Sequence, residues 1–231
     1  MRFLMLPRLL VNLKAYTESS GDRAILIAKL AERVWKETGV LIGVAPNFLD
    51  LREVSSSVEI PIFAQHVDPL PPGAFTGHVP PALVREVGAR GSLLNHSERQ
   101  ISLHHIAEAI SMMRELGLIS IVCSPTPSES AAVAALSPDA VAVEPPELIG
   151  SGIPVSKAKP DVILGSLRAI RGVNERIPLL CGAGISSGED VKAALELGSY
   201  GVLVASAVTK SPDPYRKIRE LVEPVISFTR A

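Results

Sequence analysis

Residues 140–152 read Ala-Val-Ala-Val-Glu-Pro-Pro-Glu-Leu-Ile-Gly-Ser-Gly, an apolar run that leads directly into the carboxylate of Glu144. A short continuous apolar run indicates a strand that is buried on both faces. Prolines stiffen the chain after Glu144, and glycines let the far end of the segment move. The pattern predicts a buried strand, Glu144 at its end, and a lid over residues 145–152. For this stretch taken alone, a surface loop with one acidic residue is the simpler alternative.

The same pattern recurs along the chain, because seven more short apolar runs are followed by polar residues or glycine. The run 8–11 leads into Asn12-Leu13-Lys14, and the run 91–94 leads into Asn95-His96-Ser97-Glu98-Arg99. Near-continuous apolar runs of this length are typical of strands in a parallel sheet. The other runs are 40–44, 60–64, 118–123, 177–180 and 201–204.

Amphipathic patterns separate these runs. In the segment 22–38, apolar residues recur every three or four positions, as they do in a helix with one buried face. Ser102, Ser187 and Asp213 are candidate N-terminal caps for later helices. The same spacing predicts helices over 101–116, 161–171, 187–197 and 214–227.

Eight strand–helix alternations therefore run through the chain without a break. Parallel strands joined by helices form right-handed βαβ units, and eight such units can close into a barrel. An open doubly wound sheet is the alternative. That arrangement places functional residues at one switch point, whereas here polar residues follow strands all along the chain. We predict the α/β class and a (β/α)8 barrel, as a single domain over residues 1–231.

Composition and charge exclude several kinds of partner. The chain carries a net charge of −1 and no basic cluster, so nucleic acid is not an expected partner. No apolar stretch reaches the roughly 18 residues that a membrane span needs, so no membrane partner is expected either. Cys123 and Cys181 are expected at strand ends, facing the inside of the barrel. Two cysteines make no disulfide framework, and a reducing cytoplasm is the expected location.

Several motifs occur in a fixed order over nearly the whole chain. They are Asn12-Leu13-Lys14, Ala64-Gln65 followed by Gly73-Ala74-Phe75-Thr76-Gly77, His96-Ser97-Glu98-Arg99, Glu144-Pro145 and Ile149-Gly150-Ser151-Gly152. Each motif alone is weakly specific. As an ordered set that follows the predicted strands, they resemble the triosephosphate isomerase family, whose TIM barrel fold agrees with the prediction above.

The chain departs from the usual family pattern at a few positions. Asn95 stands where most members have glycine, and Gly182-Ala183-Gly184 replaces a glycine-glycine-serine loop. Pro146 and Glu147 replace the usual lid residues. With the short length, these departures are similar to the archaeal branch of the family. Fifteen arginines against eight lysines, only two glutamines and nineteen prolines predict a thermophilic source.

The resemblance implies an isomerase of glycolysis and gluconeogenesis that interconverts dihydroxyacetone phosphate and D-glyceraldehyde 3-phosphate through an enediolate. No metal or cofactor is implied. The acid–base scheme is the established one for this family and is a standard case of pKa tuning. The resemblance implies that Glu144 is the base, that His96 is a neutral electrophile, and that Lys14 is the cation beside the oxyanion. It also implies that Asn12 orients the substrate and that Glu98 holds Lys14 in place. Ser97 is the implied partner of Glu144 when the lid is open.

The phosphate of the substrate needs several convergent N–H donors. In barrels the loops after the seventh and eighth strands commonly supply them. The resemblance implies that Asn12 and Lys14 bind the substrate together with two sets of donors. One set is Gly184, Ala205 and Ser206, and the other arrives from the closed lid with Ile149 and Gly150.

The segment 68–77 bears on assembly, because it combines several prolines with Phe75 and is too apolar to project alone into water. The resemblance implies that this loop docks beside Lys14 of a neighbouring subunit, where Thr76 braces that lysine and Asn12. A homodimer is then the minimum active unit. The archaeal look of the chain favours a homotetramer, built as a dimer of dimers, over the homodimer.

Two alternatives remain open at this point. One is another metal-free barrel enzyme that acts on a phosphorylated sugar. The other is a barrel that binds phosphate and has no catalytic activity. The joint presence of Asn12, Lys14, His96 and Glu144 argues against both.

Overall fold

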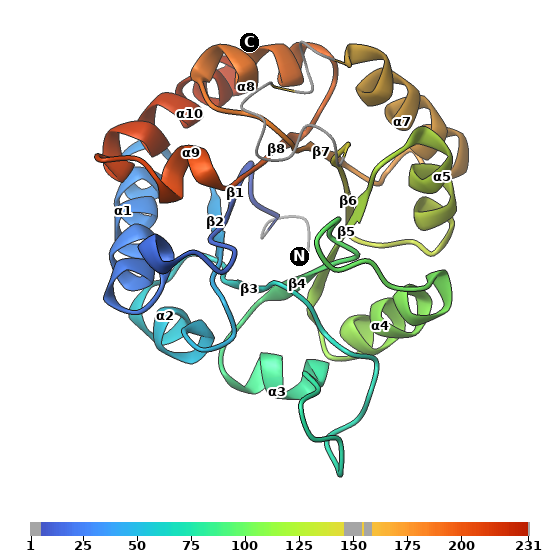
Figure 1. Cartoon of the computed structure of the whole chain (residues 1–231). Helices are drawn as coiled ribbons and strands as arrows, with labels where there is room; N and C mark the ends of the chain where they lie inside the picture. The colour runs from blue at the N-terminus through green and yellow to red at the C-terminus, as the bar shows by residue number, and fades with distance from the viewer. Residues whose placement is uncertain (1–5, 146–153, 155–158, 231) are drawn as a thin grey trace.

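Eight short strands form the centre of the molecule, and each apolar run recognised in the sequence overlaps one of them (Figure 1). The structure is a computed structural model that describes residues 6–145, 154 and 159–230. The strands are β1 (Leu9–Asn12), β2 (Ile42–Ala45), β3 (Phe63–Ala64), β4 (Gly91–Leu94), β5 (Ile119–Ser124), β6 (Ala140–Val143), β7 (Leu179–Cys181) and β8 (Gly201–Val204).

The strands are parallel and follow the order β2-β1-β8-β7-β6-β5-β4-β3 around the centre. The two ends of this sheet also meet, because Val44 in β2 forms a bridge with Ile62 and donates a hydrogen bond of 3.2 Å to the carbonyl of Pro61. Strand β3 is shorter than the run 60–64, since Pro61 has no N–H to offer a neighbouring strand. The predicted barrel is confirmed, and the open-sheet alternative is wrong.

Helices follow the strands and cover the outside of the barrel (Figure 1). Helix α1 (Asp22–Thr38) has the predicted bounds and ends at Gly39, which adopts a left-handed φ of 75°. Helix α8 (Gly188–Glu196) begins with a capping box formed by Ser187 and Asp190. The others are α2 (Leu51–Ser57), α3 (Pro81–Glu86), α4 (Leu103–Glu115), α5 (Pro127–Ala135), α7 (Pro160–Val173), α9 (Ser206–Thr209) and α10 (Pro214–Arg230), with a 3₁₀ turn η2 (Thr17–Ser19).

Two apolar clusters form the core, one inside the barrel and one between the strands and the helices. Inside, the ring of Phe63 fills space left by Gly43 and Gly91, where an added Cβ would lie 3.0 Å and 2.7 Å from the ring. Cys123 belongs to this inner cluster, as predicted. Cys181 belongs to the outer cluster, so the predicted inward position is wrong. Side chains alternate along a strand, and Leu180 takes the inward place.

The segments that follow the strands converge on one face of the barrel, the face seen in Figure 1. The connection between β3 and α3 projects furthest from the body of the molecule and carries Phe75, whose side chain is 39% exposed (Figure 1). Among the described residues, no helix is both long and apolar enough to cross a bilayer.

Candidate active site

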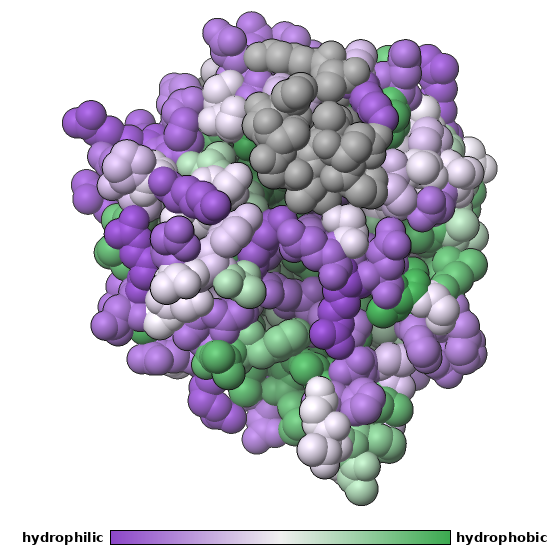
Figure 2. Space-filling view, viewed as in Figure 1, coloured by the Kyte–Doolittle hydropathy of each residue, from purple (hydrophilic) through white to green (hydrophobic). Residues whose placement is uncertain are grey.

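A small pocket lies on this face, and Figure 2 shows hydrophilic surface gathered around the centre of the same view. The pocket encloses about 60 Å³, which is space for a few water molecules or a small ligand. Its walls come from the segments that follow β1, β4, β6, β7 and β8. The lining residues are Asn12, Lys14, Tyr16, His96, Glu144, Ala183, Gly184, Ile185, Ser186, Leu203, Val204, Ala205 and Ser206.

Lys14 enters the pocket from the end of β1 with its backbone in the left-handed region, at φ 53°. That conformation costs about 1–2 kcal/mol for a residue with a Cβ, so contacts must hold it. The Lys14 N–H donates to Asn12 Oδ1 at 3.0 Å, and the Gln65 amide donates to Asn12 Oδ1 at 3.2 Å and to the Lys14 carbonyl at 2.9 Å. At the other end of the side chain, Lys14 Nζ lies 2.7 Å from Glu98 Oε1, which is the pair that the resemblance implied.

His96 follows β4 and is 7% exposed. The backbone N–H of Glu98 donates to His96 Nδ1 at 3.2 Å, so Nδ1 is an acceptor and the ring proton of the neutral imidazole is on Nε2. The preceding residue, Asn95, has φ 57° and connects its own loop to β5: its amide donates to the Cys123 carbonyl in β5, and its Oδ1 accepts from the Ile101 N–H, both at 3.0 Å. Asparagine tolerates this backbone better than most residues, which explains how it replaces glycine here.

Glu144 directly follows β6 and is 6% exposed. Its Oε2 lies 3.5 Å from His96 Nε2 and accepts no hydrogen bond within the described part of the chain. Burial and the neighbouring Glu144 carboxylate raise the pKa of the Cys123 thiol, which therefore stays protonated beside the acid. Leaving a carboxylate oxygen buried without a partner is unfavourable, and such groups concentrate at functional sites.

The opposite end of the pocket is lined by backbone from the segments after β7 and β8. Ala183 and Gly184 both adopt positive φ values, 70° and 72°. The N–H groups of Gly184, Ala205 and Ser206 donate to no acceptor among the residues that the structure describes. Backbone N–H groups of this kind can bind an anionic ligand, and the resemblance implied this role for the same three residues.

The other predicted site residues are placed as follows. Ser97 makes no hydrogen bond to Glu144 within the described residues, and the carboxylate faces His96 instead. Thr76 is exposed on the projecting loop, away from the pocket of its own chain. Ile149 and Gly150, with most of the predicted lid 145–152, lie outside the described residues.

Two further residues shape the site and were given no role in the sequence analysis. Gln65 ties Asn12 and Lys14 together, and its place directly after the third apolar run was the available signal. Gly182 leaves room for Glu144, because a Cβ at this position would lie 2.5 Å from Glu144 Cγ and 2.8 Å from Oε1. No sequence signal distinguishes that glycine from one needed only for a turn.

Comparison with known proteins relates nearly the whole chain to one family. The family model described as triosephosphate isomerase matches residues 7–223. A triosephosphate isomerase from Methanocaldococcus jannaschii is 52% identical over 215 residues, which cover 93% of this chain and 98% of that protein. One from Pyrobaculum arsenaticum is 52% identical over 220 residues, 95% and 98% of the two chains. One from Methanosarcina acetivorans is 48% identical over 216 residues, 94% and 97%. This chain therefore belongs to the triosephosphate isomerase family, and these relatives come from archaea.

Proposed function

We propose that this protein interconverts dihydroxyacetone phosphate and D-glyceraldehyde 3-phosphate by moving a proton between adjacent carbons through an enediolate. The observation that carries the proposal is the pairing of a buried carboxylate with a buried imidazole nitrogen at one small pocket. Glu144 Oε2 and His96 Nε2 lie 3.5 Å apart, and both line that pocket. The reaction needs a base for a C–H proton and a donor for the carbonyl oxygen, and these two groups supply them.

Glu144 acts as the base. The carboxylate takes a proton from the carbon next to the carbonyl and returns it to the neighbouring carbon. Gly182 keeps the space behind this side chain open, so the carboxylate can sit against the substrate.

His96 and Lys14 stabilise the negative charge that develops on oxygen. His96 donates from Nε2, because Nδ1 is occupied as an acceptor for the Glu98 N–H. Lys14 supplies a positive charge, and its ion pair with Glu98 fixes the direction of the Lys14 side chain. Asn12 directs its Oδ1 toward Lys14 and Gln65, which leaves its NH₂ group to orient the substrate. Donors that are placed before the reaction stabilise the enediolate without reorganisation during it.

The phosphate group binds the N–H groups of Gly184, Ala205 and Ser206, which donate to no acceptor among the described residues. The segment 145–152 closes over the pocket and adds donors from Ile149 and Gly150. Closure excludes water, which strengthens the electrostatic contacts within the site and protects the enediolate.

We also propose that the active molecule is an oligomer in the cytoplasm. Phe48, Leu49 and Phe75 are large apolar residues that are 37%, 94% and 39% exposed, and they belong to the loops after β2 and β3. Figure 2 shows hydrophobic surface on this side of the molecule, below the polar centre. A second subunit that covers these loops completes the site through Thr76, and a pair of such dimers makes the homotetramer. Cys123 and Cys181 are free thiols, as suits a reducing compartment.

A coupled assay on the purified protein tests the activity. We expect the protein to convert D-glyceraldehyde 3-phosphate to dihydroxyacetone phosphate, and dihydroxyacetone phosphate back to D-glyceraldehyde 3-phosphate, without added metal. A Glu144→Gln variant prepared in the same way is the control for contaminating isomerase. Equal rates for the parent and this variant would contradict the proposal.

A further inference from the structure

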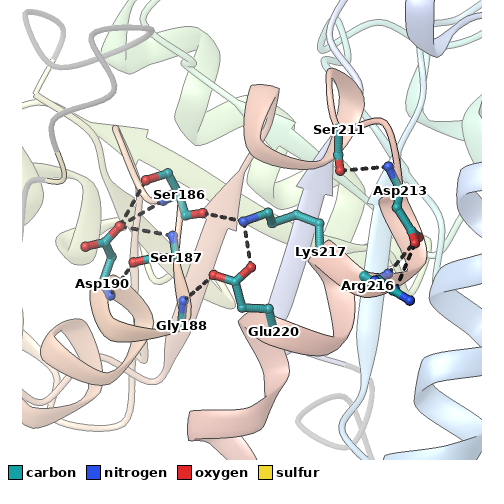
Figure 3. Close-up of polar contacts among 9 residues, drawn as sticks. All are labelled: Ser186, Ser187, Gly188, Asp190, Ser211, Asp213, Arg216, Lys217 and Glu220. Carbon is teal, nitrogen blue, oxygen red and sulfur yellow. Dashed lines mark hydrogen bonds and ion pairs between the residues drawn. The ribbon is translucent and has the colours of Figure 1, made fainter.

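The loop after β7 is held from behind by two charged side chains that do not touch the pocket. Ser186 is the last residue of this loop that lines the pocket. Its N–H and its hydroxyl both donate to Asp190 Oδ2, at 3.1 Å and 3.2 Å, and its carbonyl accepts from Lys217 Nζ at 3.1 Å (Figure 3). Asp190 is on α8, but Lys217 comes from α10, 31 residues after Ser186 in the chain.

Lys217 belongs to a short chain of hydrogen bonds that also includes the start of α8. Its Nζ lies 2.6 Å from Glu220 Oε2, and Glu220 Oε1 accepts from the Gly188 N–H at 3.2 Å (Figure 3). One turn of α10 therefore binds a carbonyl at Ser186 and an N–H at Gly188, on both sides of the point where the loop becomes a helix.

The contact between α10 and the start of α8 depends on a close approach of the two helix backbones. Gly188 has no side chain, and a Cβ there would lie 2.8 Å from the Glu220 carbonyl oxygen. Pro224 is the fourth residue after Glu220 inside the same helix, and it has no N–H to donate to that carbonyl. Gly188 and Pro224 thus allow α10 to lie directly against the start of α8.

The loop that is held in this way has an irregular backbone. Ala183 and Gly184 follow one another with positive φ values, and one end of the loop is anchored where the Gly182 N–H donates to the Val143 carbonyl at 2.9 Å. The other end is Ser186. The direction of the Gly184 N–H, between these anchors, depends on where Ser186 is fixed. Anion-binding donors are effective only when they are held in place before the ligand arrives.

We propose that Lys217 and Glu220 are positioning residues for the phosphate-binding loop 182–186: they fix Ser186 from the outside of the barrel and so set the affinity for the phosphate of the substrate. This inference rests on the proposed function. The two residues contact neither the substrate nor the reacting groups, so they act on binding of the phosphate and leave the proton transfer unchanged.

Lys217→Met is the test variant, and Arg216→Met is its matched control. Both remove one positive charge from the same turn of α10 and keep an apolar stem. Arg216 is 86% exposed, and its ion pair is with Asp213, 3.3 Å away at the start of its own helix (Figure 3). We expect Lys217→Met to raise KM roughly tenfold with kcat unchanged, the effect of one hydrogen bond to a charged group, and Arg216→Met to match the parent. Lys217→Arg should recover most of the loss.

Two further measurements separate positioning from general destabilisation. Inorganic phosphate, as a competitive inhibitor, should bind Lys217→Met more weakly by a similar factor. Turnover of unphosphorylated D-glyceraldehyde should be the same in Lys217→Met and the parent.

The inference is overturned if Lys217→Met behaves like Arg216→Met, or if Lys217→Met loses activity on glyceraldehyde by the same factor as on triose phosphate. If the parent itself fails to turn over triose phosphate, the proposed function is wrong. Calorimetric binding of inorganic phosphate to parent and Lys217→Met still decides this inference, since equal affinities overturn it.

Discussion

At the scale of single residues, the arrangement of Glu144 and His96 decides what the pocket can do. The carboxylate is 6% exposed and 3.5 Å from the imidazole, and the Glu98 N–H determines which ring nitrogen carries the proton. The sequence placed both residues at strand ends, but it did not show which tautomer the histidine adopts. That depends on a hydrogen bond within one turn of the chain.

Glu144→Asp keeps the carboxylate and withdraws it by one methylene. Proton transfer depends steeply on geometry, so we expect kcat to fall roughly 10²–10⁴-fold, with a much smaller change in KM. Steady-state kinetics in the coupled assay measure both. Thermal melting of the variant should match the parent, and comparable kcat values would contradict the role of Glu144 as base.

Gly182→Ala tests the space that holds the base. The added Cβ would lie 2.5 Å from Glu144 Cγ, so the Glu144 side chain must move. We expect kcat to fall at least roughly tenfold, because a displacement near 1 Å in the reacting groups can cost a hundredfold. Gly172→Ala is the control, since an added Cβ there meets no atom within 4 Å. Equal kcat values for the two variants would show that Glu144 relaxes without loss.

At the scale of elements, the connection between β3 and α3 is held at its base by a buried histidine. His66 is 3% exposed, and its Nε2 lies 3.1 Å from Asp68 Oδ1, while the other Asp68 oxygen accepts from the Val79 N–H at 2.7 Å. Burial lowers the pKa of His66 below its ordinary value of 6.5, although Asp68 opposes the shift. The histidine is therefore mostly uncharged at pH 7 in the folded protein.

This lowered pKa makes stability depend on pH. As pH falls below 6.5, the unfolded chain binds a proton at His66 that the folded protein resists, so the free energy of unfolding decreases. We expect the melting temperature to fall between about pH 7 and pH 5, and the slope to be smaller in His66→Asn. His104→Asn is the control, because its side chain is 77% exposed. Identical slopes in all three proteins would contradict a role for His66.

At the scale of the whole molecule, the projecting loop after β3 and the exposed Phe48 and Leu49 favour association. We expect sedimentation at assay concentration to show a tetramer. Phe75→Glu should dissociate the dimer and lower activity, because a charge replaces apolar contact in the subunit interface. Leu26→Glu is the control, on α1, where the side chain has similar exposure, 43%. A fully active monomer would contradict both steps of assembly, and an active dimer would contradict only the tetramer.

Thermal stability is a second property of the whole molecule. Fifteen arginines, two glutamines and nineteen prolines are consistent with a thermophilic source, since few amides and stiff loops resist heat. We expect a melting midpoint above the range of about 45–65 °C that is usual for mesophilic domains. A midpoint within that range would be evidence against a thermophilic source.

The sequence by itself determined the barrel and the main catalytic candidates. Eight apolar runs separated by amphipathic segments specify the strands and helices through local periodicity, and the residues after the runs must then meet at one face of a parallel barrel. Asn12, Lys14, His96 and Glu144 could be placed there without any knowledge of distances. β3 was the least accurate strand, because Pro61 interrupts pairing inside an apolar run.

The tertiary structure alone decided which residues support the site. Three of these features are contacts between segments that are distant in sequence: the space that Gly182 leaves for Glu144, the hydrogen bonds of the Gln65 amide, and the hydrogen bond from Lys217 to Ser186. A fourth, the outward direction of Cys181, depends on strand register. Local periodicity carries no information on such contacts, because it reflects which face of an element is buried. The atoms that meet between two elements are decided only by packing, because packing fixes the strand register, the distance between the elements and the direction of their backbones.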